Sequence, residues 1–188
     1  MSDMPHAMGW LRDLPDFRDY TPENDFVRPE QKELGQRSVK ANLKKIGLVG
    51  GPAPKLPASV DLRTWCSPIE DQGQLGSCTA NAAAAVVEYY ERRAFGHYID
   101  ASRLFIYKVE RDLLGWHGDT GAYLRTAMGT LASFGAPPEK YWPYNISNFD
   151  VEPTPFAYAF AQDYKAVSYY RLDAPNVTPP ILNVWPTR

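Results

Sequence analysis

Asp71-Gln72-Gly73-Gln74-Leu75-Gly76-Ser77-Cys78-Thr79-Ala80-Asn81 is the stretch on which the fold and the chemistry of this sequence depend. A glycine-rich turn leads one cysteine into an alanine-rich run, and alanine has the highest intrinsic helix propensity. We therefore predict a helix from Thr79 to about Phe95. Ser77 is its expected N-cap, and Gly96 its expected C-terminal stop.

Cys78 would then lie in the first turn of this helix. Backbone N–H groups without intrahelical partners and the positive end of the helix dipole favour an anion there, and thus the nucleophilic thiolate. Gln72 precedes the cysteine by six residues, across two glycines. If that turn folds back, the Gln72 amide and the Cys78 backbone N–H form an oxyanion hole for acyl transfer. A buried cysteine that merely starts a core helix would account for Cys78 but not for Gln72.

The same stretch resembles the active-site segment of papain-like (C1-type) cysteine peptidases. Gln72 fits the oxyanion glutamine, Gly76-Ser77-Cys78 the nucleophile turn, and Ala80 onward the central helix. Leu75 stands where many members have a second cysteine, and Thr79 replaces the usual aromatic residue. Further matching segments extend the resemblance over roughly residues 56–170: Leu56 to Arg63, Gly121 to Tyr123, Phe134-Gly135, and Tyr141 to Tyr144.

The resemblance implies a set of site residues. Cys78 would be the nucleophile and Gln72 the oxyanion donor of a peptide hydrolase that works through a thioester acyl-enzyme. An extended peptide would bind against backbone in a cleft, in the manner of an added β-strand. The residues expected to bind this substrate are Gly76, Ser77, Thr120, Gly121, Ala122 and Tyr123.

The implied fold class is α+β, a papain-like fold of which the chain holds mainly the helical half and the start of the sheet half. We expect a leader or pro-segment-like arm with a linker in residues 1–55. The helical subdomain with the first strand of the sheet would follow in residues 56–172, and an irregular proline-rich tail in residues 173–188.

Local patterns predict the remaining elements. Residues 9–20 alternate apolar and charged residues, which suits an extended arm with side chains in pockets, and the charged residues 30–45 favour a short helix. Further helices are expected over residues 103–114, 122–134 and 155–165. Ser102 would cap the first of these, and Asp119 or Thr120 the second. Residues 166–172 have the composition of a strand.

The resemblance also implies a catalytic histidine and an asparagine roughly 130–150 residues after the cysteine. Only 110 residues follow Cys78 (188 − 78 = 110), and no histidine follows His117. His97 would lie at the far end of the Cys78 helix, and His117 in a solvated loop. We therefore expect the chain alone to hydrolyse peptides poorly or not at all. A truncated reading frame, a pseudo-enzyme, and a fragment completed by a separate chain would all have this sequence.

Composition limits the partners and the compartment. The formal net charge is −2 without a long basic run, which argues against nucleic-acid or anionic-membrane partners. The N-terminus lacks the features of a secretory signal, so we expect a cytoplasmic protein. Both cysteines are expected as free thiols, with Cys66 buried as a small apolar residue, although a Cys66–Cys78 bridge remains open. No metal site and no cofactor is expected, and the expected partner is a peptide or protein substrate.

Two other functions fit parts of the sequence. One is a non-catalytic peptide-binding or inhibitory module derived from the same fold, which retention of both Gln72 and Cys78 disfavours. The other keeps Cys78 as a redox-sensing thiol. Without the missing half of the fold, an apolar face around the Cys78 helix should be exposed or covered by the N-terminal arm, and we expect dimerisation, aggregation or an arm folded across the cleft.

Overall fold

The computed structural model describes residues 8–14, 16, 27, 29–33, 35, 37–45, 47, 50–52, 55, 57–166 and 169. The chain divides into two compact units. The first comprises Met1–Leu14 and Val60–Ser168, and the second comprises Pro15–Ser59 and Tyr169–Arg188. The first unit contains the Cys78 stretch and is the larger of the two.

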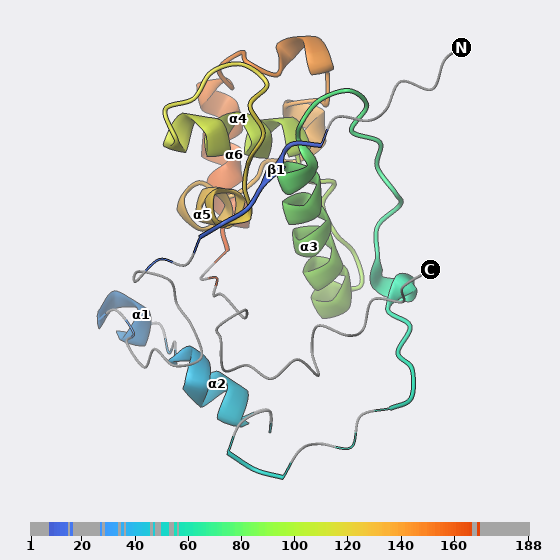
Figure 1. Ribbon diagram of the computed structural model, residues 1–188, viewed down its shortest axis with the longest axis vertical. Coiled ribbons are helices and arrows are strands. Elements are labelled where there is room, and N and C mark those ends of the chain that lie inside the picture. Colours follow the sequence, from blue (N-terminus) through green and yellow to red (C-terminus); the bar gives the residue numbers. More distant parts are fainter. Residues whose placement is uncertain are drawn as a thin grey trace. The chain divides into compact units, whose positions relative to one another are not determined.

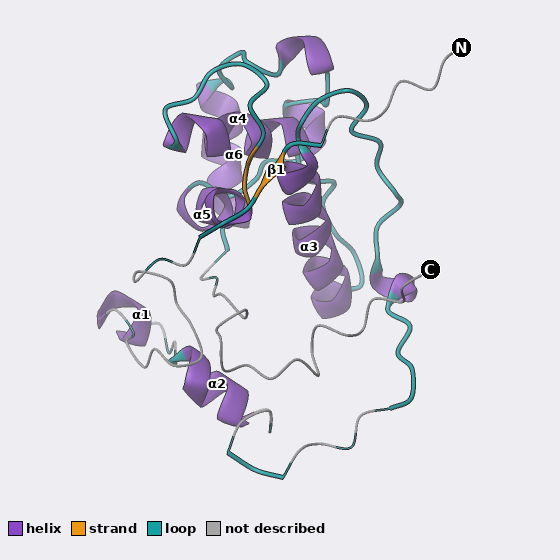
Figure 2. Cartoon of the chain, viewed as in Figure 1, coloured by secondary structure: helices purple, strands orange, loops and turns teal. Residues whose placement is uncertain are grey.

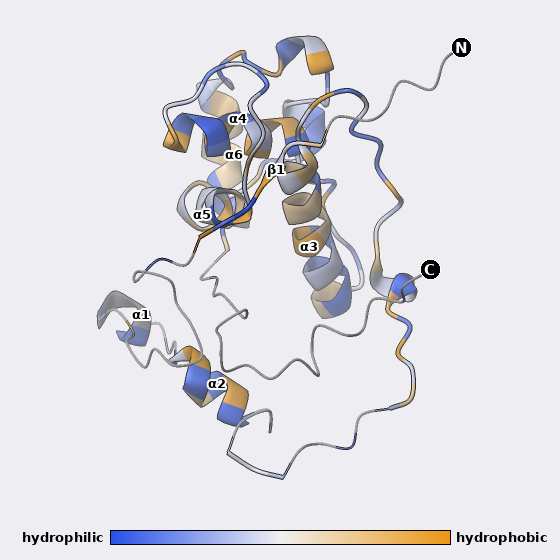
Figure 3. Cartoon of the chain, viewed as in Figure 1, coloured by the Kyte–Doolittle hydropathy of each residue, from blue (hydrophilic) through white to orange (hydrophobic). Residues whose placement is uncertain are grey.

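Helix α3 (Cys78–Phe95) confirms the predicted central helix (Figure 1). Its alanines allow close packing on one side, and Ala80, Ala83 and Ala84 are almost fully buried. Gly96 ends the helix in the left-handed conformation that favours glycine, at φ 76°, and its N–H donates to the Arg92 carbonyl. Apolar residues dominate the first turns of α3, and charged residues its C-terminal end (Figure 3).

Helix α4 (Arg103–Leu113) packs against α3 and is buried along nearly its whole length. The predicted N-cap is confirmed, since the Ser102 hydroxyl accepts a hydrogen bond from the Phe105 N–H at 3.2 Å. Among the buried residues of α4 are Glu110 and Arg111, two charged side chains in the interior of the unit.

The helix predicted over residues 122–134 starts later than expected. Ala122–Tyr123 form strand β2, and helix α5 covers Leu124–Ser133. The predicted cap is wrong, because the N-cap residue is Tyr123 and makes no side-chain cap bond. The Ala122 N–H donates a hydrogen bond to the Gly9 carbonyl at 2.9 Å. This segment therefore pairs as a strand before the helix begins.

Strand β1 (Trp10–Leu11) pairs in parallel with β2, with Trp10 opposite Ala122 and Leu11 opposite Tyr123 (Figure 2). The extended segment predicted over residues 9–20 is thus confirmed at Trp10–Leu11, and residues 8–14 are called the arm below. Its side chains do not fill pockets, however: Trp10 is 54% exposed and Leu14 71% exposed. Backbone pairing rather than apolar burial holds the arm.

The C-terminal part of the first unit is built from short elements. Helix α6 (Pro155–Ala161) is capped by Thr154 and continues into the 3₁₀ turn η4 (Gln162–Tyr164), which confirms the helix predicted there. Three further 3₁₀ turns are η1 (Arg63–Trp65), η2 (Glu139–Tyr141) and η3 (Ile146–Asn148). Most of the strand predicted over residues 166–172 lies outside the described residues.

The second unit contains helices α1 (Pro29–Glu33) and α2 (Val39–Lys45) in place of the single charged helix predicted over residues 30–45. In α2 the Ser38 hydroxyl accepts from the Ala41 N–H, as an N-cap does, and Val39 and Leu43 are buried. Among the described residues, no helix has the length and apolar character needed to cross a membrane.

Burial in the first unit is one-sided on α3. Its inner face joins the main core with α4 and α5, whereas Val86, Tyr90 and Phe95 are 43%, 64% and 69% exposed. The exposed apolar face expected from the sequence is therefore present. The residues of the main core are Leu75, Ala80, Ala83, Ala84, Ala101, Leu104, Ile106, Tyr107, Ala127, Leu131 and Ala136.

Candidate active site

Cys78 is the first residue of α3, and its side chain is partly exposed. Both cysteines are free, so the Cys66–Cys78 bridge is absent. Cys66 is exposed, and the expectation that it is a buried apolar residue is wrong: it follows η1 on the surface of the unit. A single half-exposed thiol therefore stands at a helix N-terminus, where the helix dipole favours an anion.

The turn before Cys78 is compact. The Gln72 side-chain amide donates to the Leu75 carbonyl at 3.0 Å, so it folds back over the turn, and its place beside the Cys78 sulfur stays a prediction. Leu75 is buried in the core and anchors the turn. Gln72 and Cys78 are thus the two ends of one short, internally bonded loop.

Ser77 is the N-cap residue but does not cap the helix with its side chain. Its buried hydroxyl lies 2.6 Å from the hydroxyl of Tyr144, and it accepts from the side-chain amide of Asn81 at 3.1 Å. The predicted capping role is therefore wrong, because Tyr144 and Asn81 engage the oxygen that would cap α3.

Asp119 holds the turn from the opposite side. Its Oδ1 accepts from the Gly76 N–H at 2.9 Å and from the Tyr107 hydroxyl at 2.5 Å. The Tyr107 hydroxyl in turn accepts from the Gly121 N–H at 3.1 Å. Burial, followed by the hydrogen bond to Asp119, raises the pKa of Tyr107 well above its usual value, so the phenol remains a donor. One carboxylate thus joins the nucleophile turn to the predicted substrate segment.

Three glycines, Gly9, Gly76 and Gly121, meet at the turn that precedes Cys78. A Cβ on Gly9 would lie 1.7 Å from the Gly76 carbonyl oxygen, and a Cβ on Gly121 would lie 2.1 Å from the Gly9 oxygen. Gly121 also has a φ of 70°, which disfavours any other residue. The arm therefore runs directly between the nucleophile turn and the predicted substrate segment, and only glycine permits so close an approach.

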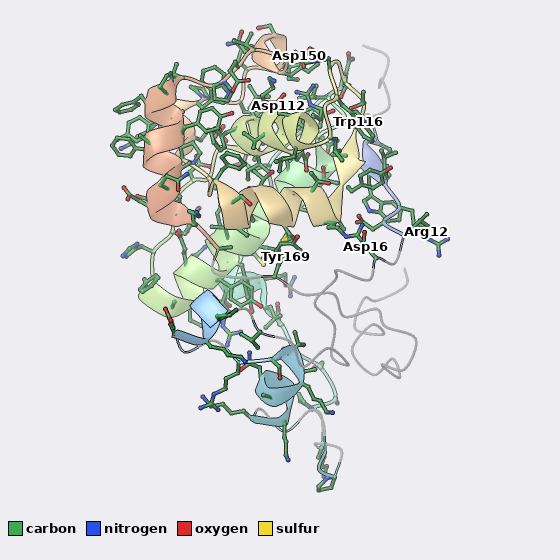
Figure 4. All side chains as sticks on the ribbon, turned by 90° about the vertical axis from the view of Figure 1, so that its left-hand side faces the viewer. Arg12, Asp16, Asp112, Trp116, Asp150 and Tyr169 are labelled. Carbon is green, nitrogen blue, oxygen red and sulfur yellow. The ribbon has the colours of Figure 1, made fainter. Side chains whose placement is uncertain are left out.

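Arg125, in the first turn of α5, fixes the arm beyond β1. Its guanidinium donates to the Leu14 carbonyl at 2.6 Å and lies 3.4 Å from the Asp13 carboxylate. On the other side of β2 the rings of Trp116 and Tyr123 are 5.7 Å apart. Trp116 is seen beside the strands in Figure 4, whereas Arg12 projects away from the helices. The arm lies along the predicted substrate-binding residues.

The predicted substrate residues are thus brought together. Gly76 and Gly121 lie against Gly9. The Ala122 N–H donates to the Gly9 carbonyl, and Tyr123 pairs with Leu11. Thr120 is exposed: its hydroxyl donates to the neighbouring Gly121 carbonyl at 3.0 Å, and its N–H donates to the Gly118 carbonyl at 3.1 Å.

Thr79 directly follows Cys78 and contacts a residue that sequence reasoning did not identify. Its hydroxyl donates to Glu110 Oε1 at 2.7 Å, and both residues are buried. Burial raises the pKa of Glu110 to about 8, opposed by the Thr79 hydrogen bond and by Arg111. The second oxygen, Oε2, has no partner among the described residues. A largely protonated carboxyl therefore lies behind the first turn of α3.

Arg111 organises the loop that carries Asp119. Its guanidinium is fully buried and donates to the carbonyls of Gly118 and Phe149. It also pairs with Asp150 at 2.7 Å, at the upper edge of the molecule in Figure 4. Asp150 Oδ2 accepts from the Gly118 N–H at 3.1 Å, which closes the loop.

No histidine within residues 57–166 is bonded to Cys78. His97 is exposed and stacks on Phe95 beyond the far end of α3, an 18-residue helix about 27 Å long. His117 is exposed in the loop before Asp119. Within the described ranges, no group of three acidic, histidine or cysteine side chains is arranged to hold a metal ion.

Comparison with known proteins gives two informative matches. The chain is 34% identical over 178 residues to an uncharacterized peptidase C1-like protein of Acanthamoeba polyphaga mimivirus, covering 92% of this chain and 53% of the relative. It is 30% identical to xylellain, a cysteine protease from Xylella fastidiosa of known crystal structure, with a TM-score of 0.64 over 89% of this chain and 59% of that one. No family model matches.

The chain thus spans about half the length of the curated relative it matches. Its helices and short strands agree with the helical half of an α+β papain-like fold, as predicted from the sequence. Together, sequence and fold show that the chain belongs to the papain-like, C1-type family of cysteine peptidases.

Proposed function

We propose that this chain supplies the nucleophile half of a cysteine peptidase. The Cys78 thiolate attacks the carbonyl carbon of an extended peptide, and the developing oxyanion is stabilised by the Cys78 backbone N–H and the Gln72 amide. The C–N bond then breaks, the amine leaves with a proton, and a thioester on Cys78 remains for water to hydrolyse. The observation that carries this proposal is the half-exposed Cys78 at the N-terminus of α3, directly after the folded Gln72 turn.

Hydrolysis needs an imidazole to protonate the leaving amine and an amide to orient that imidazole. His97 and His117 are not placed for this, as described above. We propose that both groups come from outside residues 1–188, either from further polypeptide or from a separate chain. In this proposal residues 1–188 alone form the acyl-enzyme from a reactive ester but do not turn over peptides.

The proposal includes a role for the N-terminal arm, by which we mean residues 8–14. The arm pairs with β2 and lies against Gly76, which is where an extended peptide substrate would bind. It therefore shields the substrate position next to Cys78.

An ester acylation experiment tests the proposal. The chain is treated with a p-nitrophenyl ester of an acylated glycine, and p-nitrophenolate release is followed together with mass spectrometry of the modified peptides. Cys66 is an exposed thiol in the same molecule and serves as the internal reference. We expect Cys78 to be acylated at least about tenfold faster than Cys66, since an oxyanion-hole donor contributes about 10²–10³ in rate.

Equal acylation of the two cysteines would contradict the nucleophile assignment. Multiple turnover of a fluorogenic peptide that disappears in Cys78→Ala would contradict the claim that the base lies elsewhere.

The alternative, a non-catalytic peptide-binding module, has one observation in its favour, because an extended segment does bind along β2. It requires that Cys78→Ser bind peptides as the wild type does and that Cys78 show no preferential acylation.

A further inference from the structure

Tyr144 connects the two ends of the nucleophile turn. The residue lies in the Tyr-Trp-Pro-Tyr segment after η2, and its hydroxyl donates to the Gln72 carbonyl at 3.1 Å. The same hydroxyl lies 2.6 Å from the Ser77 hydroxyl. A single phenol therefore contacts the residue expected to bind the oxyanion and the residue immediately before the nucleophile.

The direction of these hydrogen bonds follows from the number of protons. A carbonyl only accepts, so the one Tyr144 hydroxyl proton goes to Gln72, and Ser77 must donate its own proton to Tyr144. The Ser77 oxygen is then free to accept from the Asn81 amide at 3.1 Å. The Asn81 carbonyl oxygen accepts in turn from the Arg103 guanidinium at 3.3 Å. A directed chain thus runs from a cation to the Gln72 carbonyl, and bonds in such a chain polarise one another.

Arg103 also fixes the Tyr144 ring. The guanidinium carbon lies 4.1 Å from the centre of that ring, and the Arg103 side chain is only 7% exposed. Glu139 accepts two hydrogen bonds from the guanidinium, at 3.0 and 3.1 Å. Burial raises the pKa of Tyr144, so its hydroxyl keeps the proton that the chain requires at neutral pH.

We propose that Tyr144 is a positioning residue for the oxyanion site, which keeps Gln72 and Cys78 at a fixed separation by bracing both ends of the turn between them. The inference rests on the proposed function, since it assigns Tyr144 a role only if Gln72 stabilises an oxyanion. Tyr144 touches neither the substrate nor the thiol in this role. It acts through the Gln72 backbone and the Ser77 side chain.

Two reactions of Cys78 separate this role from general stabilisation. Acylation by the p-nitrophenyl ester develops an oxyanion, whereas alkylation by iodoacetamide displaces iodide from a saturated carbon and develops none. The ratio of the two rate constants therefore reports oxyanion stabilisation independently of the fraction of thiolate. The Cys66→Ala background confines both reactions to Cys78.

Tyr144→Phe removes the hydroxyl and leaves the ring under Arg103. Tyr158→Phe is the matched control, because its hydroxyl bonds to Glu152 at 2.7 Å, away from the turn. Gln72→Ala is the reference for loss of the oxyanion donor. We expect Tyr144→Phe to lower the acylation-to-alkylation ratio about tenfold, as loss of one hydrogen bond does. Tyr158→Phe should leave the ratio unchanged within about twofold.

The outcomes distinguish the two proposals. If Gln72→Ala lowers the ratio and Tyr144→Phe does not, the positioning role is refuted while the oxyanion assignment stands. If Tyr144→Phe slows both reactions equally, the residue only stabilises the fold and the inference is wrong. If neither variant changes the ratio, the oxyanion assignment fails, and the positioning role fails with it.

Discussion

Gly9→Ala is the most direct perturbation of the arm. The added methyl group would lie 1.7 Å from the Gly76 carbonyl oxygen, far inside the roughly 3.0 Å at which a Cβ first meets another atom in real structures. The atoms that flank Gly9 belong to the backbones of Gly76 and Gly121, so the clash cannot be relieved by the movement of a flexible side chain. Gly76 is fixed by Asp119 within the turn, whereas the arm is held from outside by β2 and Arg125, and the arm should therefore be displaced.

The size of the effect follows from the bonds that displacement breaks. The hydrogen bond from the Ala122 N–H to the Gly9 carbonyl is lost, and an intramolecular hydrogen bond contributes about 0.5–1.5 kcal/mol. The partly buried ion pair between Arg125 and Asp13 adds about 1 kcal/mol. A total of about 1–2 kcal/mol raises the population with a released arm about 5–30-fold.

The assay is the rate of Cys78 labelling by two reagents in the Cys66→Ala background. A peptidyl vinyl sulfone must bind along β2, so its rate should rise about 5–30-fold in Gly9→Ala. Iodoacetamide needs no such binding and should change by less than about twofold. Gly51→Ala is the matched control, because a Cβ there meets no atom within 4 Å. Equal vinyl sulfone rates in Gly9→Ala and Gly51→Ala would refute the reasoning that the arm shields the site.

Two further predictions concern buried charges. Arg111→Met should lower the free energy of unfolding by about 3–5 kcal/mol in urea titrations, since it leaves the Asp150 pair and two loop carbonyls without their donor; a loss below about 1 kcal/mol would contradict the structural role. Glu110 has a pKa raised from 4.5 to about 8, so the folded state binds more protons than the unfolded state between these values. Wild-type stability should therefore fall as the pH rises through that window, and Glu110→Gln should abolish this component. An equal stability difference between the two proteins at pH 5 and pH 8 would argue against it.

The sequence predicted the elements whose signals are local. The alanine run gave α3, Gly96 its end, and Ser102 the start of α4, because each depends on residues within one or two turns. Gln72 and Cys78 could be proposed as site residues for the same reason, as they lie six residues apart. The strand at Ala122 was missed because its partner, Trp10, is more than a hundred residues away.

The side chains that hydrogen-bond to the turn before Cys78 were missed for the same reason, because their partners lie far away in the sequence. Asp119 was expected to cap a helix, a common role for a local aspartate, but it binds Gly76 across 43 residues. Ser77 was expected to cap α3, but its hydroxyl is hydrogen-bonded to the hydroxyl of Tyr144, 67 residues away in the sequence. Glu110 gave no signal at all, because a glutamate in a helix pattern normally lies on the solvent side. Long-range polar contacts of this kind have no periodicity by which a sequence reveals them.

The crossing of Gly9 between Gly76 and Gly121 has a consequence for selectivity. A peptide that followed the same path would need glycine at that one position, since the gap between the two flanking backbones holds no room for a Cβ. Peptides with a side chain there must take a different course past Cys78. In the proposed function, a peptide with side chains therefore binds along β2 by a course that departs from the arm's course at the position of Gly9.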